Sequence, residues 1–133
     1  MRTIDIVCSI ICIDHRLLIA KRGAGVHENI WEFPGGKVEP GETKEAALVR
    51  ECQEELGVVV SVGDLFMEVT HSYPDLTVHL TLFHAVIVQG EPQKLEHQDI
   101  RWITREEISQ YPFCPADDVI LARLQAGERG AQK

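Results

Sequence analysis

The spacing of hydrophobic and polar residues predicts strands in the first part of the chain. Residues Ile4 to Ile13 are rich in Ile and Val and too short to span a membrane, so we expect a central strand that is buried on both faces. Asp14 and His15 supply a turn, and Leu17 to Lys21 should form a second strand that pairs with the first as a hairpin. A loop is expected from there to about Trp31.

The clearest helix is expected between Thr43 and Leu56. Its composition of Ala, Glu, Leu and Arg, without Gly or Pro, follows two turn signals at Pro34-Gly35-Gly36 and Pro40-Gly41. Thr43 suits the N-cap, Glu45 places a negative charge in the first turn, and Gly57 suits the left-handed position after the helix.

Strands and short helices alternate in the rest of the chain. Apolar runs predict strands over residues 58–62, 65–71, 78–88 and 100–103. Thr104 should cap a short helix, with Glu107 completing a capping box, and a further helix is expected over Ala116 to Gln125. Residues 127–133 should form a frayed tail. The pattern indicates a single domain over residues 1–133, with helices packed on a mixed sheet.

Length and charge limit the classes of partner. A chain of 133 residues with 44% hydrophobic content can bury one core without disulfides. A net charge of −8, with no cluster of basic residues, argues against binding to a nucleic acid duplex. Divalent cations would still let an acidic protein bind a polyphosphate, because the ions supply the positive charge.

The cysteines and the N-terminus bear on the cellular compartment. Cys8, Cys12, Cys52 and Cys114 include no Cys-x-x-Cys pair, and the first two lie in an apolar run, so buried free thiols are expected. The sequence has no basic and apolar leader and no apolar stretch of about 18 residues. We therefore expect a soluble, cytoplasmic protein that does not bind membranes.

Three glutamates lie together on the expected helix. Its helical period places Leu48, Cys52 and Leu56 on one stripe that should face the sheet, while Glu51, Glu54 and Glu55 form an arc beside that stripe. Like charges at these spacings repel, and a single guanidinium from Arg50 cannot neutralise three carboxylates. A divalent metal site would do so. A solvated acidic face, the usual place of Glu on a helix, is the alternative.

A longer motif contains these glutamates. Gly36, then Glu42 after five residues, then Arg50-Glu51-Cys52-Gln53-Glu54-Glu55-Leu56-Gly57-Val58 after seven more, resembles the Nudix box. Eight of its nine fixed positions match, and the exception is Cys52, where the family carries a bulky aliphatic residue. Residues 31–39 resemble the MutT-type branch, and the resemblance extends over essentially the whole chain. It implies an α/β fold, an α/β/α sandwich around a mixed sheet.

The resemblance also implies a chemistry for the box. In the family, Mg²⁺ or Mn²⁺ is held by box glutamates and a backbone carbonyl, here Glu51, Glu54, Glu55 and Gly36, while water attacks a phosphorus of the nucleotide. A bound divalent ion stabilises charge on phosphoryl oxygens and makes water more acidic, so no protein nucleophile is required.

Two further groups of residues complete the metal side of the site. Glu42 and Arg50 belong to the box, and orienting a ligand carboxylate through charged hydrogen bonds is the role expected of them. Glu96 aligns with a glutamate that binds metal or acts as a base in MutT-like members, and a surface glutamate is the alternative.

Residues for substrate binding come from three other segments. Arg22 and His27 match positions that contact the nucleotide phosphate and the sugar or base, and Phe33 matches an aromatic residue of the pocket. A core Phe and an ordinary loop His are the alternatives. Asp117 aligns with a base-contacting position and resembles a branch that acts on cytidine nucleotides; it could instead cap the last helix.

The resulting expectation is a pyrophosphohydrolase that converts a nucleoside triphosphate to the monophosphate and pyrophosphate, as a monomer or homodimer. A cytidine or modified pyrimidine triphosphate is favoured, because an ionised Asp accepts a hydrogen bond from an exocyclic amino group. An 8-oxo-dGTP diphosphatase is the alternative substrate assignment. A nucleotide-binding module that has lost catalysis is the alternative class.

Overall fold

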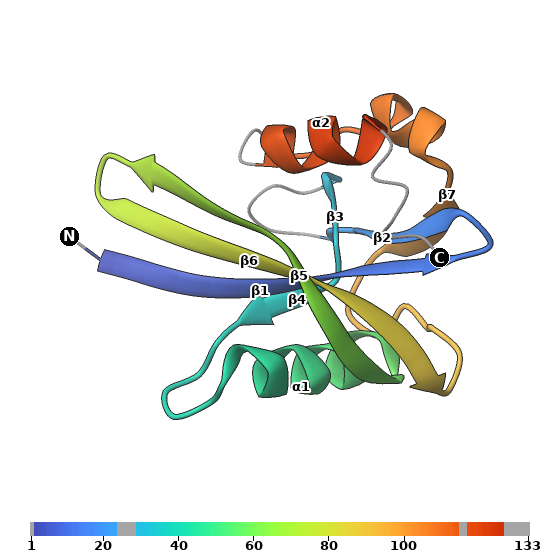
Figure 1. The fold of residues 1–133 in the computed structure, drawn as a ribbon, viewed down its shortest axis with the longest axis horizontal. Helices are drawn as coiled ribbons and strands as arrows, with labels where there is room; N and C mark the ends of the chain where they lie inside the picture. Colours follow the sequence, from blue (N-terminus) through green and yellow to red (C-terminus); the bar gives the residue numbers. More distant parts are fainter. Residues whose placement is uncertain (1, 24–28, 115–116, 127–133) are drawn as a thin grey trace.

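The computed structural model describes residues 2–23, 29–114 and 117–126, which fold into an α/β structure with a mixed sheet (Figure 1). The predicted tail at 127–133 lies outside the described residues. In chain order the elements are β1 (Arg2–Ile13), β2 (Arg16–Lys21), β3 (Trp31–Glu32), β4 (Gly35–Lys37), α1 (Lys44–Leu56), β5 (Val59–Tyr73), β6 (Leu76–Gln89), β7 (Asp99–Ile103), the 3-10 helix η1 (Arg105–Gln110) and α2 (Asp118–Gln125).

The sheet is organised around β1 and carries helices on both faces. The strand order is β3-β2-β1-β6-β5, with β4 paired to β1 and β7 paired to β2. The long pairing of β1 with β6 is parallel, whereas β1 pairs antiparallel with β2 and β4. Helix α1 lies on one side of the sheet and α2 with η1 on the other (Figure 1). Each side has its own hydrophobic cluster, so the predicted sandwich is confirmed.

The predicted hairpin between the first two strands is confirmed. Cys12 pairs with Leu17 across a two-residue turn, in which Asp14 and His15 have φ of 52° and 64°. Two successive positive φ values are the geometry of a type I′ turn, whose twist matches that of the strands. The expectation of burial on both faces holds only for the middle of β1, from Val7 to Ile11, and Ile13 at its end is exposed. Residues 2–6 are exposed or half-buried, because the helices cover only the middle of the sheet.

Helix α1 begins and ends as predicted. The Thr43 hydroxyl accepts a hydrogen bond from the Ala46 N–H at 3.0 Å, and Gly57 has a φ of 70°. Leu48, Cys52 and Leu56 are fully buried against the sheet, which confirms the predicted apolar stripe. This packing fixes the rotation of the helix about its axis, and with it the direction of every box glutamate.

Two local predictions need correction, and a third falls partly outside the described residues. The segment Pro34-Gly35-Gly36 was expected to be a turn, but Gly35 and Gly36 belong to β4, paired with β1. The two strands expected at 58–62 and 65–71 form the single strand β5, whose register against β6 shifts between Val62 and Leu65. Helix α2 begins at Asp118, and the expected start at Ala116 lies outside the described residues.

The short helix expected after β7 forms, with Glu107 at the capping-box position. The Glu107 carboxylate accepts a hydrogen bond from the Thr104 N–H at 2.8 Å, but the helix is a 3-10 helix. None of the helices in the described part of the chain has the length and apolar character needed to cross a bilayer.

Close contact between β4 and β1 makes a stability prediction at Gly35. A Cβ at this residue would overlap the Val7 carbonyl and lie 2.7 Å from the Cys8 Cα, both backbone atoms of the central strand. Gly35→Ala should therefore lower the free energy of unfolding by at least about 2 kcal/mol, measured by urea denaturation. Gly23→Ala is the matched control, since a Cβ there meets nothing within 4 Å, and should stay within about 1 kcal/mol of wild type. Equal stability of the two variants would contradict the close approach.

Candidate functional site

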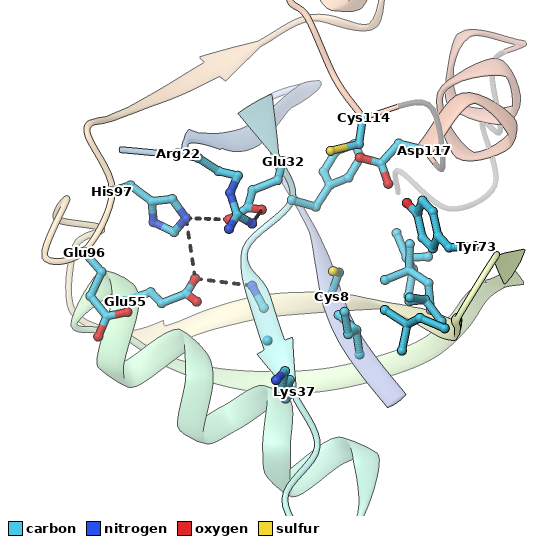
Figure 2. Close-up of a pocket in the computed structure, with 18 of the residues that line it drawn as sticks. Cys8, Arg22, Glu32, Lys37, Glu55, Tyr73, Glu96, His97, Cys114 and Asp117 are labelled. Atoms are coloured by element: carbon cyan, nitrogen blue, oxygen red, sulfur yellow. Dashed lines mark hydrogen bonds and ion pairs between the residues drawn. The ribbon is translucent and has the colours of Figure 1, made fainter. Parts of the chain in front are cut away.

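A cavity of about 860 Å³ lies over the middle of the sheet (Figure 2). One end of the cavity reaches the C-terminal end of α1, and the other end lies away from that helix. Its two ends differ in chemistry. Charged side chains gather at the end near α1, and mostly apolar side chains from β1, β5, β6 and the β5–β6 turn line the other end. The charged end is lined by Arg22, Glu32, Glu55, Glu96 and His97. The apolar end is lined by Ile6, Cys8, Tyr73, Leu76, Val78 and Leu80. Phe33, which follows β3, and Cys114 and Asp117, which precede α2, also line the cavity.

The three box glutamates differ in burial. The side chains of Glu55, Glu51 and Glu54 are 9%, 14% and 50% exposed. Of the three, Glu55 lines the cavity. The predicted arc is therefore graded, from a buried carboxylate at the cavity to a half-exposed one on the outer surface.

The two glycines of β4 bring backbone against these carboxylates. The Gly35 N–H donates a hydrogen bond to Glu55 Oε1 at 3.3 Å. A Cβ at Gly36 would lie 2.7 Å from Glu51 Oε2 and closer still to the other atoms of that carboxylate. The absence of a side chain at Gly36 is what lets the Glu51 carboxylate approach β4.

Arg50 neutralises more of the glutamate arc than its position on the helix suggested. Its guanidinium forms a bidentate ion pair with Glu42 at 2.7 and 3.0 Å, and also contacts Glu51 at 2.9 Å and Glu54 at 3.4 Å. A further hydrogen bond to the Lys37 carbonyl at 3.0 Å ties it to β4. The contact with Arg50 lowers the pKa of Glu42 to about 2, with help from the Glu39 N–H. Glu55 receives no such contact.

The pKa of the Glu55 carboxyl is raised to about 9. Burial is the largest cause, followed by its hydrogen bond with the neighbouring Glu51 and the negative charge of Glu32. Among the described residues, no three His, Cys, Asp or Glu side chains are grouped in an arrangement ready to bind a metal ion. The site thus holds a buried carboxyl that no arginine among the described residues contacts, beside the half-buried Glu51 and the exposed Glu54 and Glu96.

The loop before β7 carries Glu96 to this place. Its backbone is anchored at both ends: the Gln93 and Leu95 N–H groups donate to the carbonyls of Leu56 and Glu55, and the Gln98 N–H donates to the carbonyl of Lys21. Glu96 is exposed and lies at the rim of the cavity, close to Glu55 (Figure 2). The loop therefore brings Glu96 to the box, as the alignment required, although its side chain also fits a surface glutamate.

The predicted substrate residues are distributed along the cavity. Arg22, Phe33 and Asp117 line it, while His27 lies outside the described residues. Phe33 is 3% exposed and packs on Phe113 with ring centroids 5.5 Å apart, so it also belongs to the core. Burial, followed by the charges of Glu32 and Asp118, raises the pKa of Asp117 to about 7.

Several residues of the cavity were missed by sequence reasoning. Glu32 lies between Arg22 and His97, and Cys8 and Tyr73 line the apolar end. A charged residue between the buried Trp31 and Phe33 was a signal that could have identified Glu32. No sequence signal marked the others. All four cysteines are free thiols, as expected, but Cys52 alone is fully buried. Burial raises the pKa of the Cys8 thiol well above its usual value, which makes it a weak nucleophile.

Comparison with known proteins explains this combination of residues. A family model described as "NUDIX domain" matches residues 6–123. The chain belongs to the NUDIX family. It is 39% identical over 127 residues to the CTP pyrophosphohydrolase of Escherichia coli K12, covering 95% of this chain and 94% of that protein. It is 36% identical over 115 residues to the 8-oxo-dGTP diphosphatase of the same bacterium, covering 84% and 88%.

A solved structure agrees with this membership. The solution structure of the E. coli ORF135 protein has a TM-score of 0.85 and 38% sequence identity, and the match covers 98% of this chain and 94% of that one. The resemblance of residues 36–58 to the Nudix box and the α/β/α arrangement are therefore confirmed together. Glu51, Glu54 and Glu55 lie on α1 of a NUDIX fold, with Gly36 opposite Glu51.

The raised pKa of Glu55 predicts how stability depends on pH without metal. The folded protein holds the Glu55 proton to a higher pH than the unfolded chain does, so the free energy of unfolding should fall as the pH rises from about 5 to about 9. Urea denaturation in EDTA at a series of pH values measures this slope. Glu55→Gln should flatten the slope, whereas Glu45→Gln, on the exposed first turn of α1, should preserve it. An unchanged slope in Glu55→Gln would assign the pH dependence to other groups.

Proposed function

We propose that this NUDIX protein is a divalent-metal-dependent pyrophosphohydrolase that converts a nucleoside triphosphate and water to the monophosphate and pyrophosphate. The observation that carries the proposal is the buried, uncompensated carboxyl of Glu55 at the charged end of a cavity whose other end is apolar and large enough for a base. The names of the two E. coli relatives, a pyrophosphohydrolase and a diphosphatase, support the same reaction class.

The residues present suit Mg²⁺ or Mn²⁺. Carboxylates and a backbone carbonyl are hard oxygen ligands, and the buried carboxyl of Glu55 would ionise beside a cation. We assign the metal ligands to Glu51, Glu54, Glu55, Glu96 and the carbonyl of Gly36. Glu54 and Glu96 are exposed and would have to turn inward to bind the ion. When bound, the ion supplies charge stabilisation on the phosphoryl oxygens and a more acidic water.

The protein's own groups then orient the reactants. Arg50 holds Glu51 and Glu42 in place, which limits the conformations of a ligand carboxylate before any ion binds. The Gly35 N–H donates a hydrogen bond to Glu55 Oε1, and Glu55 Oε2 does not take part in this contact. Arg22 presents a guanidinium to the cavity, where it would bind a phosphate of the nucleotide. Glu96, at the rim, is placed to take a proton from the attacking water.

The base would occupy the end of the cavity near Phe33 and Asp117. Asp117 occupies the N-cap position of α2, as the helix-cap alternative requires, but its side chain makes no capping hydrogen bond. The premise that Asp117 acts only as an acceptor needs revision, since a pKa of about 7 leaves both forms populated near neutral pH. The ionised form accepts from an exocyclic amino group, as on cytosine, and the protonated form also donates, as an oxidised purine would require.

A cytidine or modified pyrimidine triphosphate is the favoured substrate, and 8-oxo-dGTP the second candidate. The two relatives bear names that correspond to these two assignments. Incubation with Mg²⁺ and a panel of canonical and oxidised nucleoside triphosphates tests the proposal. Release of pyrophosphate is expected, release of orthophosphate would mean attack at the terminal phosphate, and no turnover of any nucleotide would favour a binding module.

Glu54→Gln should lower kcat by at least about a hundredfold, because it removes a charge that binds the metal. The fold should remain intact, since Glu54 is half-exposed and its ion pair with Arg50 at 3.4 Å contributes less than about 1 kcal/mol. Steady-state kinetics and a thermal melt measure the two effects. Glu45→Gln is the control on the same helix and should retain wild-type kcat. Full activity of Glu54→Gln would remove Glu54 from the ligand set.

Asp117→Asn should change base preference, because it replaces an acceptor oxygen by a donor at nearly constant shape. The ratio of kcat/KM for CTP to that for 8-oxo-dGTP should fall by about tenfold or more. In the wild-type protein this ratio should rise between about pH 6 and pH 8, as Asp117 ionises, and the rise should be absent in Asp117→Asn. A constant ratio across both the substitution and the pH series would leave base selection to other residues.

A further inference from the structure

His97 occupies a position between two carboxylates of the site. Its side chain is 6% exposed, and its Nε2 lies 2.8 Å from Glu32 Oε2 and 3.9 Å from Glu55 Oε1. The first distance is a hydrogen bond and the second is too long for one. Nδ1 is buried and has no hydrogen-bond partner among the described residues. The orientation of the ring therefore depends on the bond from Nε2 to Glu32.

Glu32 passes this contact on to Arg22. Its second carboxylate oxygen, Oε1, accepts a hydrogen bond from the Arg22 guanidinium at 3.0 Å. Glu32 follows Trp31 in the two-residue strand β3, where it pairs with Ala20 of β2, and Arg22 directly follows that strand. The three side chains form a continuous chain of hydrogen bonds along one wall of the cavity, which Figure 2 shows on the side of Glu55.

The backbone around His97 is fixed to both neighbours of this chain. The Leu95 N–H donates to the carbonyl of Glu55 at 3.2 Å, and the Gln98 N–H donates to the carbonyl of Lys21 at 2.9 Å. One anchor belongs to the residue that carries the buried carboxyl, and the other immediately precedes Arg22. The loop thus holds the imidazole at a defined place between the metal end and the phosphate-binding end of the cavity.

Removal of the imidazole would have two physical consequences. Glu32 Oε2 would lose its donor, so the carboxylate could rotate and release the orientation of Arg22. Without the imidazole, the Glu32 carboxylate would also face the buried Glu55 carboxyl with no donor between the two. Both consequences affect Glu32 first, because His97 is hydrogen-bonded to Glu32 and not to Glu55.

We propose that His97 is a positioning residue of the substrate site, which holds Glu32 and, through it, sets Arg22 for binding of the nucleotide phosphate. The proposal rests on the proposed function in assigning a nucleotide to the cavity. The His97 Nε2–H donates a hydrogen bond to Glu32 whether the imidazole is neutral or charged. Loss of the imidazole would affect the glutamates that bind the metal less than it affects Arg22.

The test compares three variants. His97→Leu removes the donor, His97→Gln retains an N–H donor at a similar distance from the backbone, and Gln98→Leu changes an exposed side chain of the same loop. For His97→Leu we expect KM for CTP and the Kd of CMP, measured by calorimetry, to rise about tenfold, with kcat within about threefold of wild type. His97→Gln should recover most of the loss, and Gln98→Leu should match wild type.

Binding of Mn²⁺, followed by electron paramagnetic resonance without nucleotide, separates the two ends of the site. His97→Leu should retain Mn²⁺ affinity within about threefold of wild type. A loss of Mn²⁺ affinity with unchanged Kd for CMP would overturn the proposal, because His97 would then act on Glu55. Failure of His97→Gln to recover CMP binding, in a variant with the wild-type melting temperature, would also overturn it.

A double-mutant cycle identifies the route. In a Glu32→Ala background, His97→Leu should have no further effect on the Kd of CMP, since its partner is already absent. An undiminished tenfold effect there would overturn the route through Glu32. If the wild-type protein hydrolyses no nucleotide, the proposed function fails, and CMP binding still tests the role of His97. If the wild-type protein hydrolyses nucleotides and the two substitutions have additive effects on the Kd of CMP, only the positioning role of His97 fails.

Discussion

The carboxyl of Glu55 is buried at the end of α1 without a cation, and the arrangement of the rest of the site follows from that constraint. The burial is a consequence of packing: Leu48, Cys52 and Leu56 attach the helix to the sheet and leave Glu55 facing inward. Gly35 then approaches closely enough for its N–H to reach the carboxyl. A hydrophobic interface therefore forces an ionisable group into a place where it is stable only as a neutral acid or beside a positive charge.

Four of the surrounding carboxylates already have a partner. Arg50 contacts Glu42, Glu51 and Glu54, and Arg22 with His97 holds both oxygens of Glu32. Arg50 and Arg22 are thus paired around the edge of the site, and the carboxyl at its centre has no guanidinium contact among the described residues. This distribution favours an external cation there, because the fixed ion pairs keep the arginines from reaching Glu55. Family membership in NUDIX and the identity of the E. coli relatives are consistent with that reading of the charges.

A second tuned carboxyl lies at the opposite end of the cavity. Asp117 is partly buried, and its raised pKa places its ionisation near neutrality, whereas the pKa of Glu55 lies about two units higher, at about 9 against about 7. The charge of Glu32 contributes to both shifts, so this residue links the two ends electrostatically. The thiol of Cys8 and the ring of Tyr73 line the apolar end of the cavity. The protonation state of Asp117 would decide whether its carboxyl accepts a hydrogen bond from a bound base or donates one to it.

The sequence by itself determined the helix from Thr43 to Leu56, the first hairpin and the family, since capping residues, turn residues and helical spacing are local properties. It could not determine that Gly35 and Gly36 form a strand, because that depends on how closely β1 approaches them. Nor could it identify His97, whose two carboxylate neighbours are 65 and 42 residues away in the chain. Burial, ion-pair partners and the resulting pKa values are properties of the packed state, so only the tertiary structure decided which glutamate was left without a cation.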